Sequence, residues 1–237
     1  ENPIKKVYLD YSASTPMDKD VLGGMLPYYD FKYGNPSSMH GRGRLAHDVI
    51  QNCKSEISKV LSCKANEIIF TGSGTESDNM AIFGIARAYR KYGNHIIISA
   101  IEHKAVMESA KVLEKEGFEI SIAPVNAEGI VDINILESLI NSRTILVSVM
   151  YANNEIGTIQ PISEIASLIR EFRERNSTQF PFLHTDACQV AGYLDINIDN
   201  LGVDLMSLNG SKIYGPKGIG ILFKRNEIKI SPIIVGG

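Results

Sequence analysis

Short apolar segments alternate with helix-like segments along most of the chain, and this alternation restricts the fold more than any other feature. Several of the apolar segments are apolar on both faces, as strands are when helices cover both sides of a parallel sheet. The segments expected to be strands are 68–71, 96–98, 119–123, 145–149, 181–184 and 205–208, with a return strand at 219–223. The sequence therefore predicts an α/β fold of three layers, α/β/α, around a mainly parallel sheet.

Helical periodicity accounts for most of the remaining residues. Apolar side chains recur at helical spacing in 44–62 and also in 17–31, where they are Val21, Leu22, Met25 and Leu26. Further helices are expected at about 76–92, 103–115, 132–140 and 162–173. Residues 1–16 are expected to form an arm that contains a short strand at 7–9.

Composition excludes several classes of function. The 237 residues carry a formal net charge of −3, so no basic field favours nucleic acid or an anionic membrane. The three cysteines show no CxxC spacing, which argues against a disulfide framework and a cysteine zinc site. The five histidines are scattered and offer no anchor for a metal, and no apolar run is long enough to span a membrane.

One lysine follows an apolar strand at a turn. The strand 205–208 runs into Asn209-Gly210-Ser211 and delivers Lys212 at its end. A lysine fixed in this way can be desolvated and kept neutral, which makes its amine a nucleophile toward an aldehyde. Considered alone, it is more often a solvated lysine beside a hairpin turn.

A second strand leads into the loop Gly72-Ser73-Gly74-Thr75 at the start of a helix. Free backbone N–H groups, the helix dipole and the two hydroxyl groups suit a phosphate. No Gly-Lys-Ser/Thr follows, so the loop is not a Walker A motif. An ordinary Gly/Ser turn with a helix cap explains the loop about equally well.

Polar residues at other strand ends are the remaining candidates. Asp186 ends a mostly apolar strand, where an acid needs a cationic partner such as a protonated pyridine nitrogen, or else caps the next helix. Gln189 could donate to a phenolate oxygen, although considered alone it is more often a solvated helix residue. The ring of His103 could cover a heteroaromatic ring, although a loop histidine is more often exposed or a helix cap. Asn154 and its neighbour Asn153 also suit a turn.

Two further residues are expected to be structural. His184 lies within a strand and is expected to be a hydrogen-bonded core histidine. Cys188 lies beside an acid rather than a cation, so it is expected to be a small buried residue and not a nucleophile.

One ligand accounts for these candidates together. Pyridoxal 5′-phosphate (PLP) requires a lysine for its aldehyde, an acid for its ring nitrogen and a phosphate cup at a helix start. Lys212, Asp186 and the 72–75 loop supply all three at strand ends of one predicted sheet.

The sequence resembles the group I cysteine desulfurases, which are NifS/IscS-like fold-type I PLP enzymes. The resemblance runs in order through essentially the whole chain, and its motifs are specific only when taken together. The segments that carry it are Tyr8-Leu-Asp-Tyr-Ser-Ala-Ser-Thr-Pro16, Gly34-Asn-Pro-Ser-Ser38 with His40, Thr71-Gly-Ser-Gly-Thr-Glu-Ser-Asp-Asn79, Glu102-His-Lys-Ala-Val106, Asn153-Asn-Glu-Ile-Gly157, His184-Thr-Asp-Ala-Cys-Gln189 and Lys212-Ile-Tyr-Gly-Pro-Lys-Gly218.

The resemblance implies a role for each matching position. Lys212 and His103 are implied as catalytic residues, the first binding the cofactor aldehyde and the second stacking on the ring and moving protons. The residues implied to bind the cofactor are Gly74, Thr75, His103, Asn154, Asp186, Gln189, Asn209, Ser211 and Lys212.

Two departures from the family pattern stand out. Family members usually have Ser-Gly-His before the lysine, whereas this chain has Asn209-Gly210-Ser211, so weaker cofactor retention is expected. The family's persulfide-forming cysteine, its carboxylate-binding arginine and a phosphate-binding residue of the second subunit match nothing here. The chain is therefore expected to be a truncated large domain, 17–237, whose arm 1–16 belongs to the small domain in full-length relatives.

The resemblance implies conversion of L-cysteine to L-alanine, with the sulfur passed on for iron–sulfur cluster assembly or tRNA thiolation. It implies a homodimer that works with an iron–sulfur scaffold or sulfur-acceptor protein, in the cytoplasm or in a mitochondrial or other organelle matrix. The alternatives are a selenocysteine lyase or aminotransferase of the same fold, and a non-catalytic PLP-binding or dimerisation fragment. This fragment, lacking the nucleophilic cysteine, is expected to show little turnover alone.

Overall fold

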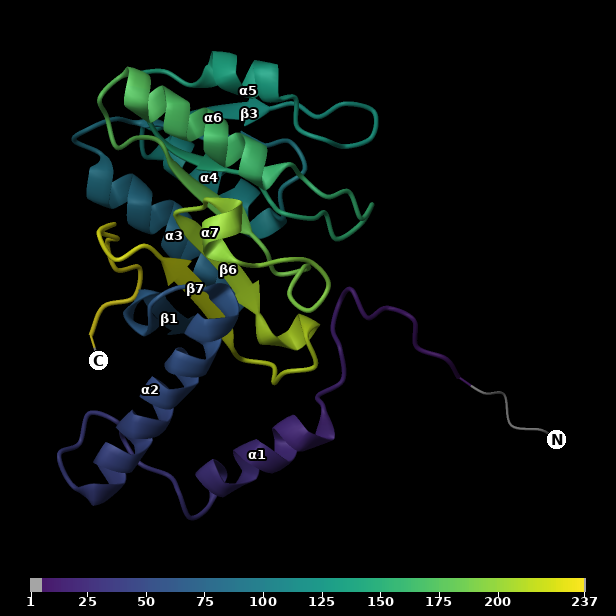
Figure 1. Cartoon of the computed structure of the whole chain (residues 1–237), viewed down its shortest axis with the longest axis vertical. Helices are drawn as coiled ribbons and strands as arrows, with labels where there is room; N and C mark the ends of the chain where they lie inside the picture. The colour runs from purple at the N-terminus through teal and green to yellow at the C-terminus, as the bar shows by residue number, and fades with distance from the viewer. Residues whose placement is uncertain (1–5, 237) are drawn as a thin grey trace.

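The computed structural model describes residues 6–236 and is built around one seven-stranded sheet (Figure 1). The strand order is β1-β7-β6-β5-β4-β2-β3. Only β7 runs opposite to its neighbours among these strands, since it pairs antiparallel with both β1 and β6. The strands are β1 (Ile68–Thr71), β2 (His95–Ser99), β3 (Glu119–Ala123), β4 (Thr144–Ser148), β5 (Phe182–Asp186), β6 (Leu205–Asn209) and β7 (Gly220–Lys224).

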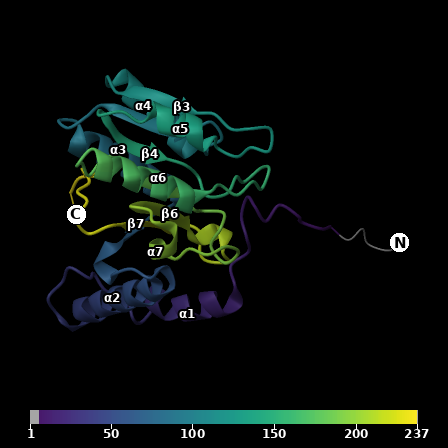
Figure 2. The same ribbon diagram turned by 45° about the horizontal axis from the view of Figure 1, so that its top comes forward.

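Helices cover both faces of the sheet (Figures 1 and 2). Successive residues of β2 show why, because Ile97 packs in one apolar cluster while Ile96 and Ile98 pack in the other. The first cluster includes residues of α5, α6 and α7, and the second includes residues of α3 and α4. The helices are α1 (Lys19–Tyr29), α2 (Gly41–Leu61), α3 (Gly74–Tyr89), α4 (Lys104–Lys115), α5 (Ile133–Leu139), α6 (Ile162–Arg175) and α7 (Ile198–Leu201).

The predicted α/β/α architecture with a mainly parallel sheet is confirmed. The expected helices and the strands of the sheet are present, with boundaries that differ by a few residues. Helix α2 begins earlier than expected because His40 caps it, its Nδ1 accepting from the backbone N–H of Gly43. Strand β5 continues to Asp186, two residues beyond its predicted end.

One expectation about the N-terminal region is corrected. The strand predicted at 7–9 is absent from the described part of the arm, because no other strand lies beside it to pair with, and Leu9 is 87% exposed. The helix expected within 17–31 is present as α1, and no residue of this helix is buried. Residues 1–5 of the predicted arm and residue 237 lie outside the described residues.

The short helix α7 was not predicted, because only four residues form it and its helical periodicity is too brief to detect. No helix within residues 6–236 combines the length and apolar character that a membrane span requires.

Candidate active site

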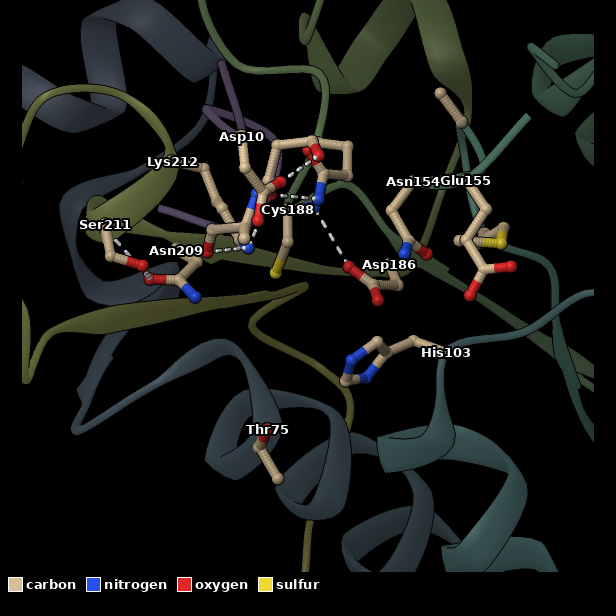
Figure 3. A pocket seen from close by; sticks show the side chains of 15 residues that line it. Asp10, Thr75, His103, Asn154, Glu155, Asp186, Cys188, Asn209, Ser211 and Lys212 are labelled. Atoms are coloured by element: carbon tan, nitrogen blue, oxygen red, sulfur yellow. Dashed lines mark hydrogen bonds between the residues drawn. The ribbon is translucent and has the colours of Figure 1, made fainter. Parts of the chain in front are cut away.

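A cavity of about 700 Å³ opens where several strands reach their carboxyl ends (Figure 3). In α/β folds this edge of the sheet is where ligands bind. Eight of the nine predicted site residues line the cavity: Thr75, His103, Asn154, Asp186, Gln189, Asn209, Ser211 and Lys212. The structure therefore brings together residues that are up to 137 positions apart, between Thr75 and Lys212.

The hairpin between β6 and β7 positions Lys212. Asn209 ends β6, and its Oδ1 accepts from both the backbone N–H and the hydroxyl of Ser211 at 3.0 Å. A 3₁₀ turn, Gly210–Lys212, follows and presents the lysine at the rim of the cavity. Its Nζ donates to the carbonyl oxygens of Ser12 at 2.7 Å and Ala13 at 2.6 Å.

The N-terminal arm forms one side of the cavity, and no role had been predicted for it. The backbone N–H of Thr15 donates to the carbonyl oxygen of Ser211 at 2.9 Å, and its hydroxyl accepts from the Tyr214 backbone at 2.8 Å. Lys217, the second lysine of the hairpin, donates to the carbonyl oxygen of Thr15 at 2.6 Å. The segment 8–16 carried the family resemblance, which was the available signal for these contacts.

Asp186 lies at the floor of the cavity, at the end of β5, and is 6% exposed. Its Oδ1 accepts from the backbone N–H of Cys188 at 2.9 Å. The alternative that Asp186 caps a following helix is wrong, because residues 187–194 form turns and no helix begins there. The carboxylate therefore faces the cavity with a single backbone donor.

The start of α3 offers fewer phosphate donors than the sequence suggested. Ser73 is the N-cap, and its hydroxyl accepts from the backbone N–H of Glu76. The N–H of Gly72 donates to the Glu76 carboxylate at 2.7 Å. The N–H groups of Gly74 and Thr75 are bonded to no described residue, and Thr75 lines the cavity. These two N–H groups and the Thr75 hydroxyl remain for an anion at a helix N-terminus.

Gly74 does not line the cavity, but its position does not tolerate a side chain. A Cβ there would lie 2.6 Å from Sγ of Cys188 and 3.4 Å from Cβ of Asn209. The absence of a side chain thus lets α3 approach the turns that carry Asp186 and Lys212.

His103 caps α4, with its Nδ1 accepting from the Ala105 backbone N–H at 3.1 Å. One ring nitrogen and one carboxylate oxygen each of Asp78 and Asp186 all lie within 4.8 Å of one another. Figure 3 shows the ring of His103 facing Asp186 across the cavity. Gln189 donates to the carbonyl oxygen of Ser12 at 3.0 Å, so its amide also holds the arm. Asn153 forms the expected turn, since its Oδ1 accepts from the backbone N–H groups of Glu155 and Ile156.

The structural expectation for His184 is confirmed. His184 is fully buried between the hydroxyls of Ser148 and Ser207, and burial lowers its pKa to about 3. Cys188 was expected to be buried, but it is half-buried and lines the cavity. Its surroundings and the nearby Asp186 still raise the pKa of its thiol well above the usual value, which disfavours a nucleophilic thiolate.

Two buried acids behind the cavity were missed by sequence reasoning. Burial raises the pKa of Glu102 to about 8, although the Ser99 hydroxyl and the Met150 N–H donate to it. Burial and the nearby Asp186 raise the pKa of Asp78 well above its usual value. Both residues lie within motifs of the family resemblance, but neither has a local pattern that predicts burial.

The residues present fit PLP. A lysine, a nearly buried carboxylate and free N–H groups at a helix start surround one cavity, and the carboxylate lacks a cationic partner among the described ion pairs. A protonated pyridine nitrogen supplies that cation. Asp78, His103 and Asp186 lie close together, and the last two are the groups that a pyridine ring requires, so the cluster fits the cofactor.

The fold and this cavity define a class of protein, and comparison with known proteins agrees. The chain belongs to the aminotransferase class-V family, whose model matches residues 7–237. This family depends on PLP, which is therefore the cofactor that the site is built to hold.

Within the family, the chain is similar to cysteine desulfurases. It is 48% identical over 233 residues to "Cysteine desulfurase IscS" of Dictyoglomus turgidum, covering 98% of this chain and 57% of that protein. It is 44% identical over 234 residues to "Probable cysteine desulfurase, mitochondrial" of Dictyostelium discoideum, covering 98% of this chain and 50% of that protein. The chain thus spans a little over half the length of the curated relatives that it matches.

Two solved structures share the fold closely. One, described as "NIFS-LIKE PROTEIN", superposes with a TM-score of 0.93 at 39% identity, covering 98% of this chain and 62% of that one. Another, described as "SspA in complex with cysteine", has a TM-score of 0.90 at 37% identity, covering 98% of this chain and 65% of that one.

Proposed function

We propose that the protein is a PLP-dependent cysteine desulfurase that converts L-cysteine to L-alanine and passes the sulfur to a cysteine of the enzyme. The observation that carries the proposal is the meeting of Lys212, Asp186 and Thr75 around one cavity. Its supports are the relatives named cysteine desulfurase and the similar structure described as a complex with cysteine.

Each residue of the cavity has a proposed task. Lys212 holds the cofactor through its aldehyde carbon, Asp186 pairs with the ring nitrogen, and the N–H groups of Gly74 and Thr75 bind the phosphate. His103 stacks on the ring. Asn154 and Gln189 lie on the cavity wall, where their amides can reach the ring oxygen or the substrate carboxylate. Asn209 orients Ser211, which replaces the family's histidine with one hydroxyl donor.

Bound PLP supplies an electron sink that makes the Cα–H bond of an amino acid acidic. The chain's own part is then to hold the amino acid and to move protons. Lys212 and His103 line the same cavity and are the groups proposed to take or give a proton at Cα. The arm and the strand ends line this space from two sides.

We also propose that residues 17–237 form the PLP-binding large domain and that the arm 1–16 belongs to a small domain. A homodimer, with an iron–sulfur scaffold or another sulfur acceptor as partner, is proposed from the similarity to the proteins named IscS. The same similarity supports a cytoplasmic location, and the relative named mitochondrial supports a mitochondrial or other organelle matrix as the alternative.

The first test concerns the cofactor. The 237 residues are incubated with PLP and treated with borohydride, and the expected product is a pyridoxyl adduct on Lys212 and on no other lysine, identified by peptide mass mapping. An adduct on other lysines alone would contradict the proposal.

The second test concerns the reaction. The full-length protein is given L-cysteine and a thiol reductant without a keto acid, and the expected products are alanine and sulfide, whereas the 237 residues alone are expected to show little turnover. Dependence of alanine formation on a keto acid would indicate an aminotransferase. A strong preference for selenocysteine would indicate a selenocysteine lyase. PLP binding without turnover in the full protein would indicate a binding module.

A further inference from the structure

We propose that Asp78 is a positioning residue that forms a buried acid pair with Asp186 and carries the pair's single proton. Asp186 then holds the only negative charge presented to the ring nitrogen of the cofactor. The inference rests on the proposed function only for the identity of the ring, since the pairing itself is a property of the chain.

Geometry places the two acids together. Asp78 lies in the second turn of α3 and is 1% exposed, whereas Asp186 ends β5 beside it. A carboxylate oxygen of each lies within 4.8 Å of the other and of a ring nitrogen of His103. Two carboxylates at this separation in a buried site repel each other strongly when both are ionised.

The hydrogen bonds distinguish the two members of the pair. Oδ1 of Asp78 is buried and makes no hydrogen bond with any described residue. Oδ1 of Asp186 accepts from the Cys188 N–H, and this residue also lines the cavity. An ionised oxygen without donors is the more costly of the two, so the proton belongs on Asp78 and the charge on Asp186.

The groups that face Asp78 offer it no compensating cation. Across from α3, strand β5 contributes His184, whose Nε2 lies 3.7 Å from Oδ1 of Asp78 and whose pKa is lowered to about 3. The segment after β2 contributes Glu102, a further acid, and His103 at the start of α4. No lysine or arginine pairs with Asp78 among the described ion pairs. Burial first, and then the charge of Asp186, raise the pKa of Asp78, and the hydroxyl of Ser207 on β6 opposes this rise without reversing it.

A protonated Asp78 has two consequences for the site. It keeps the net charge of the acid pair at −1, so a single pyridinium cation neutralises the pair. Asp78 is also buried behind Asp186, and such a low-dielectric surrounding strengthens the interaction between that carboxylate and a ring nitrogen.

Infrared difference spectroscopy on the protein without PLP tests the proton directly. At neutral pH the wild type is expected to show the C=O band of buried carboxylic acids, which disappears at strongly alkaline pH. Asp78→Asn is expected to remove part of this band, Glu102→Gln another part, and the double variant nearly all of it. A wild-type spectrum without the band, or a band unchanged by Asp78→Asn, would overturn the proposal. If Asp78→Asn fails to fold, Glu102→Gln still decides the matter, because the band that remains in that variant is the one expected from Asp78, and its absence would overturn the proposal.

Cofactor binding tests the consequence. Asp78→Asn keeps the shape of a protonated acid, so PLP affinity is expected to stay within about threefold of wild type at pH 7. At alkaline pH the wild-type absorbance spectrum of bound PLP is expected to shift as Asp78 ionises, and the asparagine variant is expected to lack that shift. A tenfold loss of affinity in Asp78→Asn at pH 7 would show that the charge is needed there.

The two measurements separate the two proposals. If PLP binds to no form of the protein, the proposed function fails, whereas the infrared result still reports whether Asp78 holds a proton. If PLP binds to Lys212 but the infrared band does not depend on Asp78, the acid pair fails and the proposed function stands.

Discussion

The floor and the rim of the cavity are built on opposite principles. The floor is Asp186 together with Asp78, His184 and Glu102 behind it, all buried between the sheet and its helices. The rim consists of Lys212, Ser211, Gln189 and the arm residues 12–15, which are mostly exposed or half-buried and bonded through backbone carbonyl groups. Burial therefore determines the protonation states of the side chains in the floor. Hydrogen bonds to backbone carbonyl groups determine the positions of the side chains in the rim. Substitutions at the two places are expected to fail in different ways.

The largest effect is expected at Lys212, the chemical centre of the rim. Lys212→Ala removes the amine that holds the cofactor aldehyde, so the borohydride-trapped adduct should be lost completely and turnover should fall at least about 1,000-fold. Peptide mass mapping and an alanine-release assay measure the two effects. Lys217→Ala is the matched control, because Lys217 lies in the same hairpin and, within residues 6–236, its amine bonds only to the carbonyl oxygen of Thr15 in the arm. An adduct that persists in Lys212→Ala would show that Lys212 is not the residue that binds the cofactor.

The next effect is expected at Asp186 on the floor. Asp186→Asn keeps the acceptor for the Cys188 N–H but removes the charge, and loss of one member of a buried charge pair costs about 2–5 kcal/mol. PLP affinity, measured by the quenching of protein fluorescence, should fall at least about tenfold. Asp195→Asn serves as control, since Asp195 lies on an exposed turn after the site. An unchanged affinity for PLP would show that the charge of Asp186 does not pair with the ring nitrogen.

A third prediction concerns stability and pH. Burial raises the pKa of Glu102 in the folded protein to about 8, from the ordinary value of about 4.5. The folded protein therefore holds a proton that the unfolded chain releases. This contribution to stability is fully present below about pH 4.5 and is lost as the pH rises toward 8, by about 1.4 kcal/mol per pH unit.

Urea unfolding of the protein without PLP measures this slope. Glu102→Gln should flatten it between about pH 5 and 8, because a glutamine oxygen can still accept from Ser99 and Met150 but does not titrate. Glu128→Gln, on an exposed turn, should leave the slope as it is. An unchanged slope in Glu102→Gln would mean that the floor is ionised and hydrated after all.

The smallest effect is expected at Ser211, again on the rim. Its hydroxyl donates to Asn209 and is only partly buried, so it gives a phosphate at most one neutral donor. Ser211→His adds reach and, when protonated, charge, and should slow the loss of PLP on dialysis several-fold, by about 1 kcal/mol. Absorbance after dialysis measures it, with Ser211→Ala as the matched control. Equal retention in wild type and Ser211→His would contradict the prediction.

The floor and the rim also differ in how many of their residues and contacts could be predicted from the sequence. Periodicity predicted the sheet and therefore the strand ends at which Asp186 and Lys212 lie, because apolar runs separated by helices have few alternative arrangements. It did not reveal Asp78 or Glu102, because burial of an acid depends on which elements pack over it. Both sit in polar stretches that read as helix starts or loops.

The arm shows the opposite limit. Its motif was recognised, but its predicted strand at 7–9 was wrong and its contact with Lys212 was not foreseen. Those contacts use the carbonyl oxygens of Ser12 and Ala13, and every residue has a carbonyl. Interactions made by the backbone leave no signature in the identity of a side chain.

The single antiparallel strand β7 determines which side of the cavity is rigid and which side can move. Because β7 pairs with both β6 and β1, the loop that bears Lys212 is clamped by Asn209 opposite Gly220 and by the sheet beyond. The facing wall is the arm, which holds its place through a handful of hydrogen bonds near Thr15. A bulkier amino acid would thus be accommodated by movement of the arm. The hairpin would hold the amine of Lys212 in place.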